Sequence, residues 1–321
     1  MKKVIVTGIN GLIGQYITEP LNKLGFEVFG IGTKHIEKHN YFYADLNDHK
    51  KLESIFNEIK PEYLIHLAWD TKKGYLDSDY NFDLLYSSIK MFRYFKENGG
   101  KKAVFIGTCF EYKFKDAPLK EYDELNPETI YAKTKNYLRE VSELYSNKNN
   151  IDFCWGRVFY TYGSNENPNR LFPYIINSLK NNQKVSINYS QLKKDYMFAG
   201  DIAKAISMIT DSNLNGIINL CSGNALSLGY IASLIANSMN KIQLLDLKEL
   251  NSNEPNIIVG DNSILLNELN FSYTNIDEVI NHIIMSYNKN YVILLLILYV
   301  KLLNYLLFLI KITNFFYLQI K

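Results

Sequence analysis

The opening of the chain constrains its fold more than any other stretch. Residues 4–7 are β-branched, glycines follow at positions 8, 11 and 14, and an amphipathic segment runs from Leu12 to Leu24. A strand, a glycine-rich turn and a helix start are typical of a site for a dinucleotide pyrophosphate. A glycine-rich turn of any parallel α/β protein is the alternative interpretation. The residues expected to bind a cofactor here are Gly8, Asn10, Gly11, Leu12, Ile13 and Gly14.

Length and composition narrow the class of protein. The 321 residues suggest about two domains with a sizeable core. The formal net charge is +2 and the charges are interspersed, so no basic field indicates nucleic-acid binding. Three scattered cysteines argue against a disulfide framework, and the first apolar run is too short for a signal peptide. We therefore expect a cytoplasmic protein, and we expect no metal site.

Strands and helices alternate along most of the chain. The expected strands are residues 26–31, 41–46, 62–68, 101–106 and 151–158, with a late strand and loop at 216–223, and the expected helices are residues 80–97, 127–147 and 226–239. This alternation predicts an α/β protein with a Rossmann-like, doubly wound parallel sheet, in which ligands bind beyond the carboxyl ends of the strands. His66 lies inside an apolar run, and we expect a hydrogen-bonded core histidine there.

The end of the second strand bears on the choice of cofactor. An acid there would bind the ribose 2′-hydroxyl of NAD, but the chain has Thr33 and Lys34, which could accept a 2′-phosphate. NADP(H) is therefore favoured, with NAD(H) as the alternative. Asp45 and Leu46 end the third strand, where the acid could reach the adenine. Other residues at strand ends expected to border the cofactor are Leu67 and Ala68.

A tyrosine and a lysine share one face of the helix that Pro127 introduces. Tyr131 and Lys135 are four residues apart, and an ammonium near a phenol lowers the pKa of the phenol. Thr108, at the end of the fifth strand, could orient a substrate oxygen beside them. The same Tyr-x-x-x-Lys spacing also begins at residues 86, 189 and 317, and we expect surface or packing roles for those three.

Several segments recur in a characteristic order. They are Thr7-Gly8-x-x-Gly11-x-x-Gly14, His66-Leu-Ala68, Thr108, Tyr131-x-x-x-Lys135 and Lys194-Asp195-Tyr-Met-Phe-Ala-Gly-Asp201-Ile-Ala203. Over residues 1–287 the chain resembles the extended short-chain dehydrogenase/reductase family that modifies nucleotide-diphosphate sugars. The resemblance implies a catalytic triad of Thr108, Tyr131 and Lys135, with the lysine also holding the nicotinamide ribose. It also implies a nucleotide-sugar substrate and a homodimer formed through two long helices.

Departures from the family pattern narrow the reaction. The 4,6-dehydratases of this family have Asp-Glu after the catalytic threonine, where this chain has Cys109 and Phe110. The fucose-synthase type has a cysteine and a histidine at the positions of Phe110 and Arg170. The pattern that remains suits a reductase of a 4-keto sugar nucleotide. A 4-epimerase uses the same triad and is the alternative, and a nucleotide-sensing module without catalysis is a third, although it would not need the intact triad.

The second half of the chain contributes the expected substrate site. The stretch Arg157-Val-Phe-Tyr160-Thr-Tyr-Gly163 is similar to the family's Arg-x-x-Asn-x-Tyr-Gly segment, with Tyr160 in place of the asparagine. Arg170 and Lys194 are candidates for the substrate pyrophosphate, because a doubly charged anion needs fixed cations. The residues expected to contact substrate are Thr108, Cys109, Phe110, Arg170 and Lys194.

Three regions are expected along the chain. Residues 1–163 form the dinucleotide-binding domain, and residues 164–287 form a smaller substrate domain whose chain returns to the first. Residues 288–321 form an apolar tail, in which 291–310 are rich in Leu, Ile, Val and Phe but contain Lys301 and Asn304. Insertion of this segment into a membrane is marginally favourable. Association with a membrane, packing of the tail on the protein, and an extension without a role are the alternatives.

Overall fold

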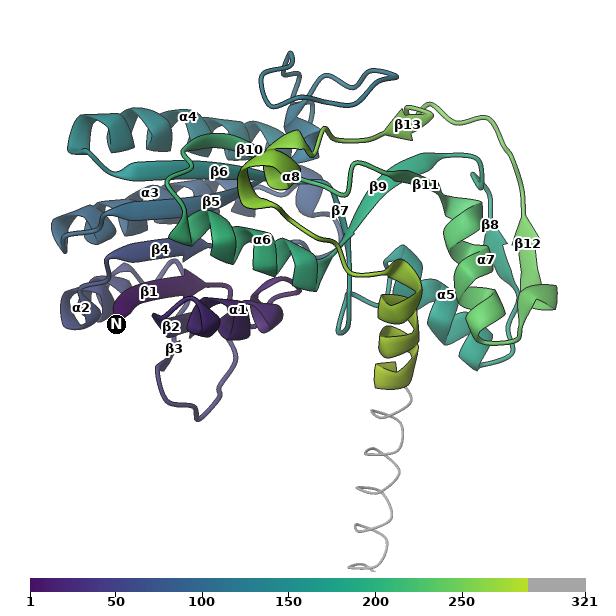
Figure 1. Cartoon of the computed structure of the whole chain (residues 1–321), viewed down its shortest axis with the longest axis horizontal. Helices are drawn as coiled ribbons and strands as arrows, with labels where there is room; N and C mark the ends of the chain where they lie inside the picture. Colours follow the sequence, from purple (N-terminus) through teal and green to yellow (C-terminus); the bar gives the residue numbers. More distant parts are fainter. Residues whose placement is uncertain (288–321) are drawn as a thin grey trace, which may run out of the picture. The chain divides into compact units, whose positions relative to one another are not determined.

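The computed structural model describes residues 1–287 (Figure 1). Its contacts separate one compact unit, Met1–Asn275, from a second unit that begins at Ile276. Residues 276–287 of the second unit are helical. No helix within the described part of the chain has the length and apolarity that crossing a bilayer requires. The predicted apolar tail, 288–321, with its candidate membrane segment at 291–310, lies outside the described residues.

A seven-stranded sheet forms the centre of the first unit. Its strands are β1 (Lys2–Thr7), β2 (Phe26–Gly32), β3 (Tyr41–Tyr43), β4 (Tyr63–His66), β5 (Lys102–Thr108), β6 (Asp152–Val158) and β10 (Gly216–Leu220). The strand order is β10-β6-β5-β4-β1-β2-β3, and every neighbouring pair is parallel. The predicted doubly wound parallel sheet is therefore confirmed. Its order reverses at β1 and β4, which brings the glycine-rich turn to the crevice where such sheets bind ligands.

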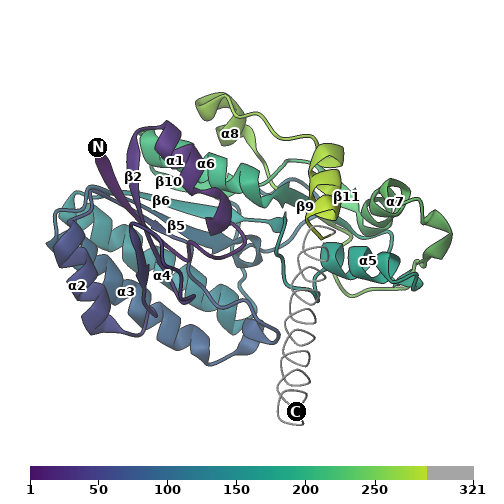
Figure 2. The same ribbon diagram turned by 90° about the horizontal axis from the view of Figure 1, so that it is seen from below.

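Helices cover both faces of this sheet (Figure 2). One face carries α2 (His49–Ile59), α3 (Tyr80–Glu97) and α4 (Ile130–Asn149), and the other carries α1 (Thr18–Lys23) and α6 (Ala199–Asp211). The alternation of side chains along β1 shows why both faces are apolar. Ile5 packs into the cluster under α2 and α3, whereas Val4 and Val6 pack into the cluster under α1 and α6.

Smaller elements lie beyond the carboxyl ends of the strands. A second sheet has the order β11 (Ala225–Ser227), β9 (Lys193–Phe198), β13 (Ile257–Ile258), and β7 (Tyr160–Tyr162) also pairs with β9. The other elements there are β8 (Val185–Ile187), β12 (Leu245–Leu247), α5 (Leu171–Lys180) and α7 (Leu228–Ser238). The helix α8 (Ser263–Leu269) packs instead on the large sheet, against β10 and α6. Contacts group all of these with the large sheet in one unit, because β10 and α6 return to it. A domain boundary between residues 163 and 164 stays a prediction.

The first predicted helix is the main correction to the fold. A continuous helix over residues 12–24 is wrong, because a 3₁₀ turn (Gly14–Tyr16) precedes a short α1. Pro20 explains the break, since proline lacks an N–H and is tolerated only in the first turn of a helix. The third and fourth strands are also shorter than predicted and end at Tyr43 and His66. By contrast, α3 has the predicted bounds.

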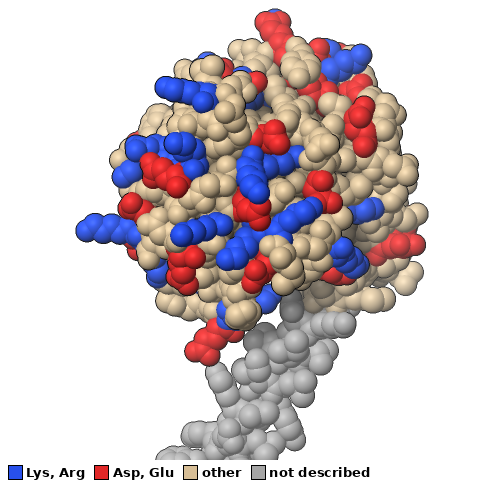
Figure 3. Space-filling view, turned by 60° about the vertical axis from the view of Figure 1, so that its left-hand side comes forward, with Lys and Arg blue, Asp and Glu red and all other residues tan. Residues whose placement is uncertain are grey.

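The surface and the cysteines agree with the composition. On the face shown in Figure 3, basic and acidic side chains are interspersed over the described residues. Cys109, Cys154 and Cys221 are all free and buried, so no disulfide links these three.

Candidate active site

A cavity of about 660 Å³ opens at the carboxyl ends of the central strands. The glycine-rich turn after β1 forms one wall, the end of β5 and the first turns of α4 form another, and the loop after β7 closes a third. All six residues predicted to bind the cofactor through the glycine-rich turn line this cavity, as do Thr108, Tyr131 and Lys135. Sequence segments more than a hundred residues apart therefore meet at one place.

The glycines make the turn compatible with a bound dinucleotide. Gly8 has a φ of +70°, and a Cβ atom there would lie 2.7 Å from the backbone nitrogen of Ala68. A Cβ on Gly14 would collide with the carbonyl oxygen of Gly8. At Gly11 the nearest atom to such a Cβ is Gly8 O at 3.1 Å, so a side chain would extend into the cradle that the backbone lines. These residues fit a pyrophosphate held by backbone groups, as in dinucleotide-binding folds.

The remaining predicted cofactor residues are placed differently. Leu67 lines the cavity, and the Ala68 N–H contacts the Thr7 hydroxyl at 3.4 Å. Thr33 and Lys34 are exposed after β2 and do not line the cavity. Asp45 and Leu46, in the segment that follows β3, also lie outside it: the carboxylate of Asp45 accepts from the Asn47 N–H, and Leu46 is buried in the core.

Three side chains form the candidate catalytic group. The Thr108 hydroxyl hydrogen-bonds the phenol of Tyr131, which lies in the first turn of α4. One turn later, Lys135 is buried and donates from Nζ to the carbonyl oxygen of Ile106, at 2.8 Å. The Thr129 hydroxyl caps α4 by accepting from the Ala132 N–H, which fixes where the helix begins. The helix start therefore sets the position of the tyrosine beside the end of β5.

Burial controls the protonation of this group. It raises the pKa of the Tyr131 phenol well above its usual value, and the bond from Thr108 acts in the opposite direction. Burial also lowers the pKa of the Lys135 ammonium to about 7. The expectation that Lys135 gives Tyr131 a lowered pKa is therefore wrong for this structure, because desolvation favours the neutral form of both groups. The phenol is held protonated, which suits a proton donor.

Two aromatic residues that sequence reasoning missed complete this wall. The ammonium of Lys135 lies 3.7 Å from the ring centroid of Trp69, and the indole donates to Asn81 Oδ1. Tyr75 contacts the ring of Tyr131 edge-on, with 4.9 Å between centroids. Both Trp69 and Tyr75 line the cavity, but neither belongs to a spaced motif, so the sequence carries no signal for them.

A buried ion pair supports the end of β5. Glu111 and Arg157 are fully buried, with 2.7 Å between Oε2 and Nε. The same carboxylate accepts from the Thr108 N–H and from the indole of Trp155. The end of β6 thus contributes Arg157 to the support of Thr108, which the sequence did not reveal. The acid at position 111 does not line the cavity.

The predicted substrate residues fall into two groups. Cys109, Phe110 and Arg170 line the cavity, and burial raises the pKa of the Cys109 thiol well above its usual value. Lys194 does not line it, because its buried side chain pairs with Glu254 at 2.9 Å and lies over the ring of Tyr160. Its role toward a substrate stays a prediction.

Two other sequence predictions are confirmed by contacts. His66 is buried between the hydroxyls of Thr7 and Ser88, at 2.7 and 2.9 Å, so it is a hydrogen-bonded core residue. Burial lowers the pKa of this imidazole well below its usual value. Tyr86 and Tyr189, which share the Tyr-x-x-x-Lys spacing, are exposed at the surface. The fourth such tyrosine, at position 317, lies outside the described residues.

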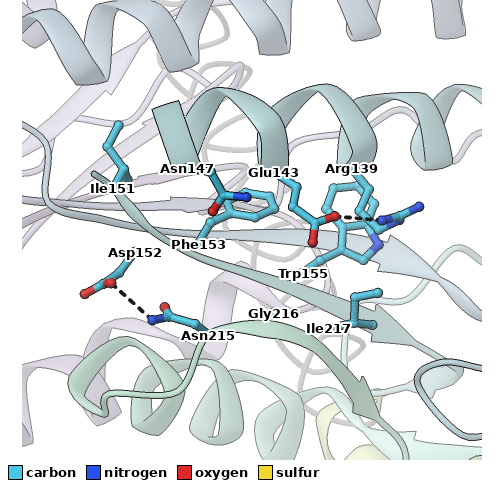
Figure 4. A pocket seen from close by; sticks show the side chains of 10 residues that line it. All are labelled: Arg139, Glu143, Asn147, Ile151, Asp152, Phe153, Trp155, Asn215, Gly216 and Ile217. Atoms are coloured by element: carbon cyan, nitrogen blue, oxygen red, sulfur yellow. Dashed lines mark hydrogen bonds and ion pairs between the residues drawn. The ribbon is translucent and has the colours of Figure 1, made fainter. Parts of the chain in front are cut away.

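A second cavity, of about 340 Å³, lies between α4, the edge strand β10 and its neighbour β6 (Figure 4). Its polar groups are paired with one another, since Arg139 bonds Glu143 at 2.9 Å and Asn215 donates to Asp152 at 3.1 Å. It shares no lining residue with the first cavity. Nothing in it matches the chemistry of the glycine-rich turn. Within residues 1–287, no cluster of three or more His, Cys, Asp or Glu side chains is placed to hold a metal ion.

The fold is that of the dinucleotide-binding Rossmann class, and it places Thr108, Tyr131 and Lys135 in the same cavity as the glycine-rich turn. Comparison with known proteins makes this more specific. Residues 4–221 match the model of the NAD-dependent epimerase/dehydratase family. The chain belongs to this family, and the resemblance inferred from its motifs is confirmed.

Three known proteins illustrate the relationship. The chain is 27% identical over 239 residues to dTDP-6-deoxy-L-talose 4-dehydrogenase (NAD(+)) of Aggregatibacter actinomycetemcomitans, covering 70% of this chain and 86% of that protein. It is 26% identical over 226 residues to CDP-abequose synthase of Salmonella typhimurium, covering 65% and 70%. The solved structure of UDP-glucose 4-epimerase from Thermotoga maritima superposes with a TM-score of 0.80 at 17% identity, covering 90% and 99%. That likeness is one of fold.

Proposed function

We propose that this chain is an oxidoreductase that reduces the keto group, at C4, of a deoxy-sugar nucleotide. One observation carries the proposal: the glycine-rich turn and the Thr108–Tyr131–Lys135 group line the same cavity. Two relatives, named as a 4-dehydrogenase and a synthase of nucleotide sugars, support the substrate class. A bound nicotinamide would supply the hydride for the carbonyl carbon.

The residues of the chain would handle the oxygen and its proton. The Tyr131 phenol, held protonated by burial, donates its proton to the oxygen as the carbonyl is reduced. The Thr108 hydroxyl fixes the position of the phenol and of the oxygen. Lys135 changes charge near pH 7, so in its protonated form it stabilises the phenolate that remains. Acid catalysis of this type contributes roughly 10²–10⁴-fold to the rate.

The surroundings of Thr108 support reduction over dehydration. Elimination of water needs an acid and a base near the sugar, but the residues after Thr108 are Cys109 and Phe110. The carboxylate of the next residue, Glu111, already accepts hydrogen bonds from three buried groups. These are the Thr108 N–H, the Trp155 indole and the Arg157 guanidinium. A 4-epimerase would use the same three catalytic residues, so the distinction between reductase and epimerase needs an experiment.

The cofactor preference is a separate part of the proposal. Thr33 and Lys34 at the end of β2 present no carboxylate to repel a 2′-phosphate, which favours NADP(H). The family description and the name of the first relative both specify NAD, so they give that preference no support. We propose that both cofactors bind, and that Lys34 adds affinity for the phosphorylated one.

The test follows nicotinamide absorbance with NADH or NADPH and a 4-keto-6-deoxy sugar nucleotide. A reductase consumes the cofactor in proportion to the sugar. An epimerase interconverts UDP-glucose and UDP-galactose without net cofactor consumption. A protein that binds the nucleotides and does neither is the non-catalytic module. The reductase proposal is abandoned if cofactor consumption does not rise above that of the Tyr131→Phe variant.

A homodimer is a further proposal, supported by the surface of α3 and α4. Large apolar side chains are exposed on both helices: Phe82, Tyr86, Tyr137, Val141 and Leu144. Exposed apolar residues that gather on adjacent elements mark a protein interface. The two helices pack side by side in the layer that Figure 2 shows below the sheet.

A further inference from the structure

Glu166, a residue that lines the active-site cavity, has a buried carboxylate oxygen without a partner. Five buried side-chain atoms in the described part of the chain have no hydrogen-bond partner, and Oε2 of Glu166 is the one whose residue lines this cavity. Glu166 lies in the loop after β7. Leaving a buried acceptor unpaired costs free energy, so such an atom needs an explanation. Because Glu166 lines the cavity, a ligand group bound there is a candidate partner for its carboxyl.

The groups near Glu166 satisfy only part of the hydrogen-bonding capacity of its carboxyl. The Gly163 N–H donates to it, the guanidinium of Arg170 attracts it, and its charge contributes to raising the pKa of the Tyr196 phenol. Burial nevertheless raises the pKa of Glu166 to about 8, with Arg170 and the amide acting in the opposite direction. The protein therefore desolvates this carboxyl without completing its hydrogen bonds.

Ring contacts relate Arg170, the cation that attracts Glu166, to the candidate catalytic tyrosine. The guanidinium of Arg170 lies 5.8 Å from the ring centroid of Tyr75, and Tyr75 contacts Tyr131. Glu166, Arg170, Tyr75 and Tyr131 all line the cavity. A sugar whose keto oxygen meets Tyr131 therefore extends along a wall that has a carboxyl and a guanidinium farther out.

We propose that Glu166 binds a hydroxyl group of the sugar and selects substrates by their hydroxyl pattern. The proposal rests on the proposed function, since it assumes a sugar-nucleotide substrate. A hydroxyl can donate to a charged carboxylate or accept from a protonated one, whereas a phosphate oxygen suits only the protonated form. Arg170, the cation beside it, is the group suited to the pyrophosphate. The sugar and the pyrophosphate thus have different residues of one loop as partners.

Binding measurements separate these contacts. Isothermal titration is performed with UDP, dTDP, CDP and GDP, and with the glucose conjugate of each, on wild-type protein and the variants Glu166→Ala, Glu166→Gln and Asn169→Ala. We expect E166A to weaken the preferred glucose conjugate about fivefold to tenfold, the value of one hydrogen bond, and to leave the nucleoside diphosphate unchanged. E166Q, which can still donate and accept, should lose less. Asn169 is exposed in the same loop and outside the cavity, so N169A is the matched control.

The melting temperature provides a second readout. Because the carboxyl is desolvated and only partly paired, we expect E166A and E166Q to melt no lower than the wild type. A lower melting temperature, with an equal loss of affinity for the nucleoside diphosphates and for their glucose conjugates, would show a structural role and overturn the proposal. An equal loss of affinity for both at an unchanged melting temperature would also overturn it, and would assign Glu166 to the pyrophosphate.

The proposed function can fail separately. If a glucose conjugate binds to the wild type and E166A binds it equally well, the role of Glu166 is refuted and the proposed function stands. If the wild type binds none of the eight nucleotides, the proposed function fails, and the role of Glu166 fails with it.

Discussion

Glu111 and Arg157 form an ion pair in which both side chains are completely buried, 2.7 Å apart. They are 46 residues apart in the sequence and join the loop after β5 to β6. The arginine also donates to the carbonyl oxygen of Glu121 and lies over the ring of Tyr112, 4.4 Å from its centroid. The pair therefore connects three segments that surround Thr108.

Removing one member of this pair should destabilise the protein strongly. Glu111→Gln leaves the guanidinium buried without a counter-charge, and we expect it to lower the free energy of unfolding by about 3–5 kcal/mol. Urea unfolding followed by circular dichroism measures this. Glu124→Gln, which breaks an exposed pair with Lys113, is the control and should cost at most about 1 kcal/mol. A loss in E111Q no larger than that of the control would show that the pair contributes little.

Tyr131 is expected to be essential for turnover and dispensable for cofactor binding. Tyr131→Phe removes the proton donor and keeps the ring that packs against Tyr75, so kcat should fall roughly 10²–10⁴-fold. Titration of protein fluorescence with NADH should give an unchanged dissociation constant. Tyr189→Phe, with the same spacing to a lysine but at the surface, should keep full activity. Substantial turnover in Y131F would remove the phenol from the mechanism.

The lowered pKa of Lys135 predicts a pH-dependent stability. The ammonium titrates near pH 7 in the folded protein and near its ordinary value of 10.5 in the unfolded chain. Between these values the unfolded chain binds more protons, so this group makes the protein more stable as the pH rises. Below pH 7 both states are protonated, and the folded state bears the full cost of the buried charge.

Lys135→Met measures this contribution directly. The variant should be more stable than the wild type below pH 7, and its advantage should shrink above pH 7 by up to about 1.36 kcal/mol per pH unit. Lys148→Met, at an exposed position of the same helix, should show no such trend. Parallel pH profiles for K135M and the wild type would contradict a lowered lysine pKa.

Lys34 tests the proposed role of the loop after β2. If its ammonium lies near a 2′-phosphate, Lys34→Ala should weaken NADPH binding about two- to fivefold at low salt and leave NADH unchanged, as expected for an exposed charge. Fluorescence titration with each cofactor measures both constants. Lys38→Ala, in the same exposed loop, is the control. Equal effects on both cofactors would exclude selection of the 2′-phosphate by Lys34.

Local sequence signals and tertiary packing account for different parts of the result. The periodic pattern of α3 and the glycines of the first turn depend on neighbouring residues, so the sequence alone places them. Thr108 and the α4 pair are predictable as well, because parallel strands bring their carboxyl ends to one edge. The contact of Trp69 with Lys135 is different, since it depends on how a loop folds over a helix.

The protonation states of the site residues also depend on tertiary packing and could not be predicted from the sequence. The spacing of Tyr131 and Lys135 predicts an ammonium next to a phenol, but the structure buries both groups, and burial reverses the expected shift in the tyrosine pKa. Glu166 is similar, since an Asn- and Pro-rich loop gives no sign that a residue lining the cavity has a buried, unpaired carboxylate oxygen. Desolvation is a property of the folded chain, so spacing along the sequence cannot supply it.

The apolar surface of α4 predicts an interface between two copies of the chain. Tyr137, Val141 and Leu144 recur at helical spacing, and the side chain of Leu144 is 72% exposed. Leu144→Glu would place a charge in the centre of a dimer contact, where desolvating it is costly. We expect light scattering to give a dimer mass for the wild type and a monomer mass for L144E, with an unchanged melting curve for the monomer fold.

Leu266→Glu, an equivalent change at an exposed leucine of α8, should leave the mass unchanged. The α3 and α4 surface is ruled out as the interface if L144E keeps the wild-type dimer mass.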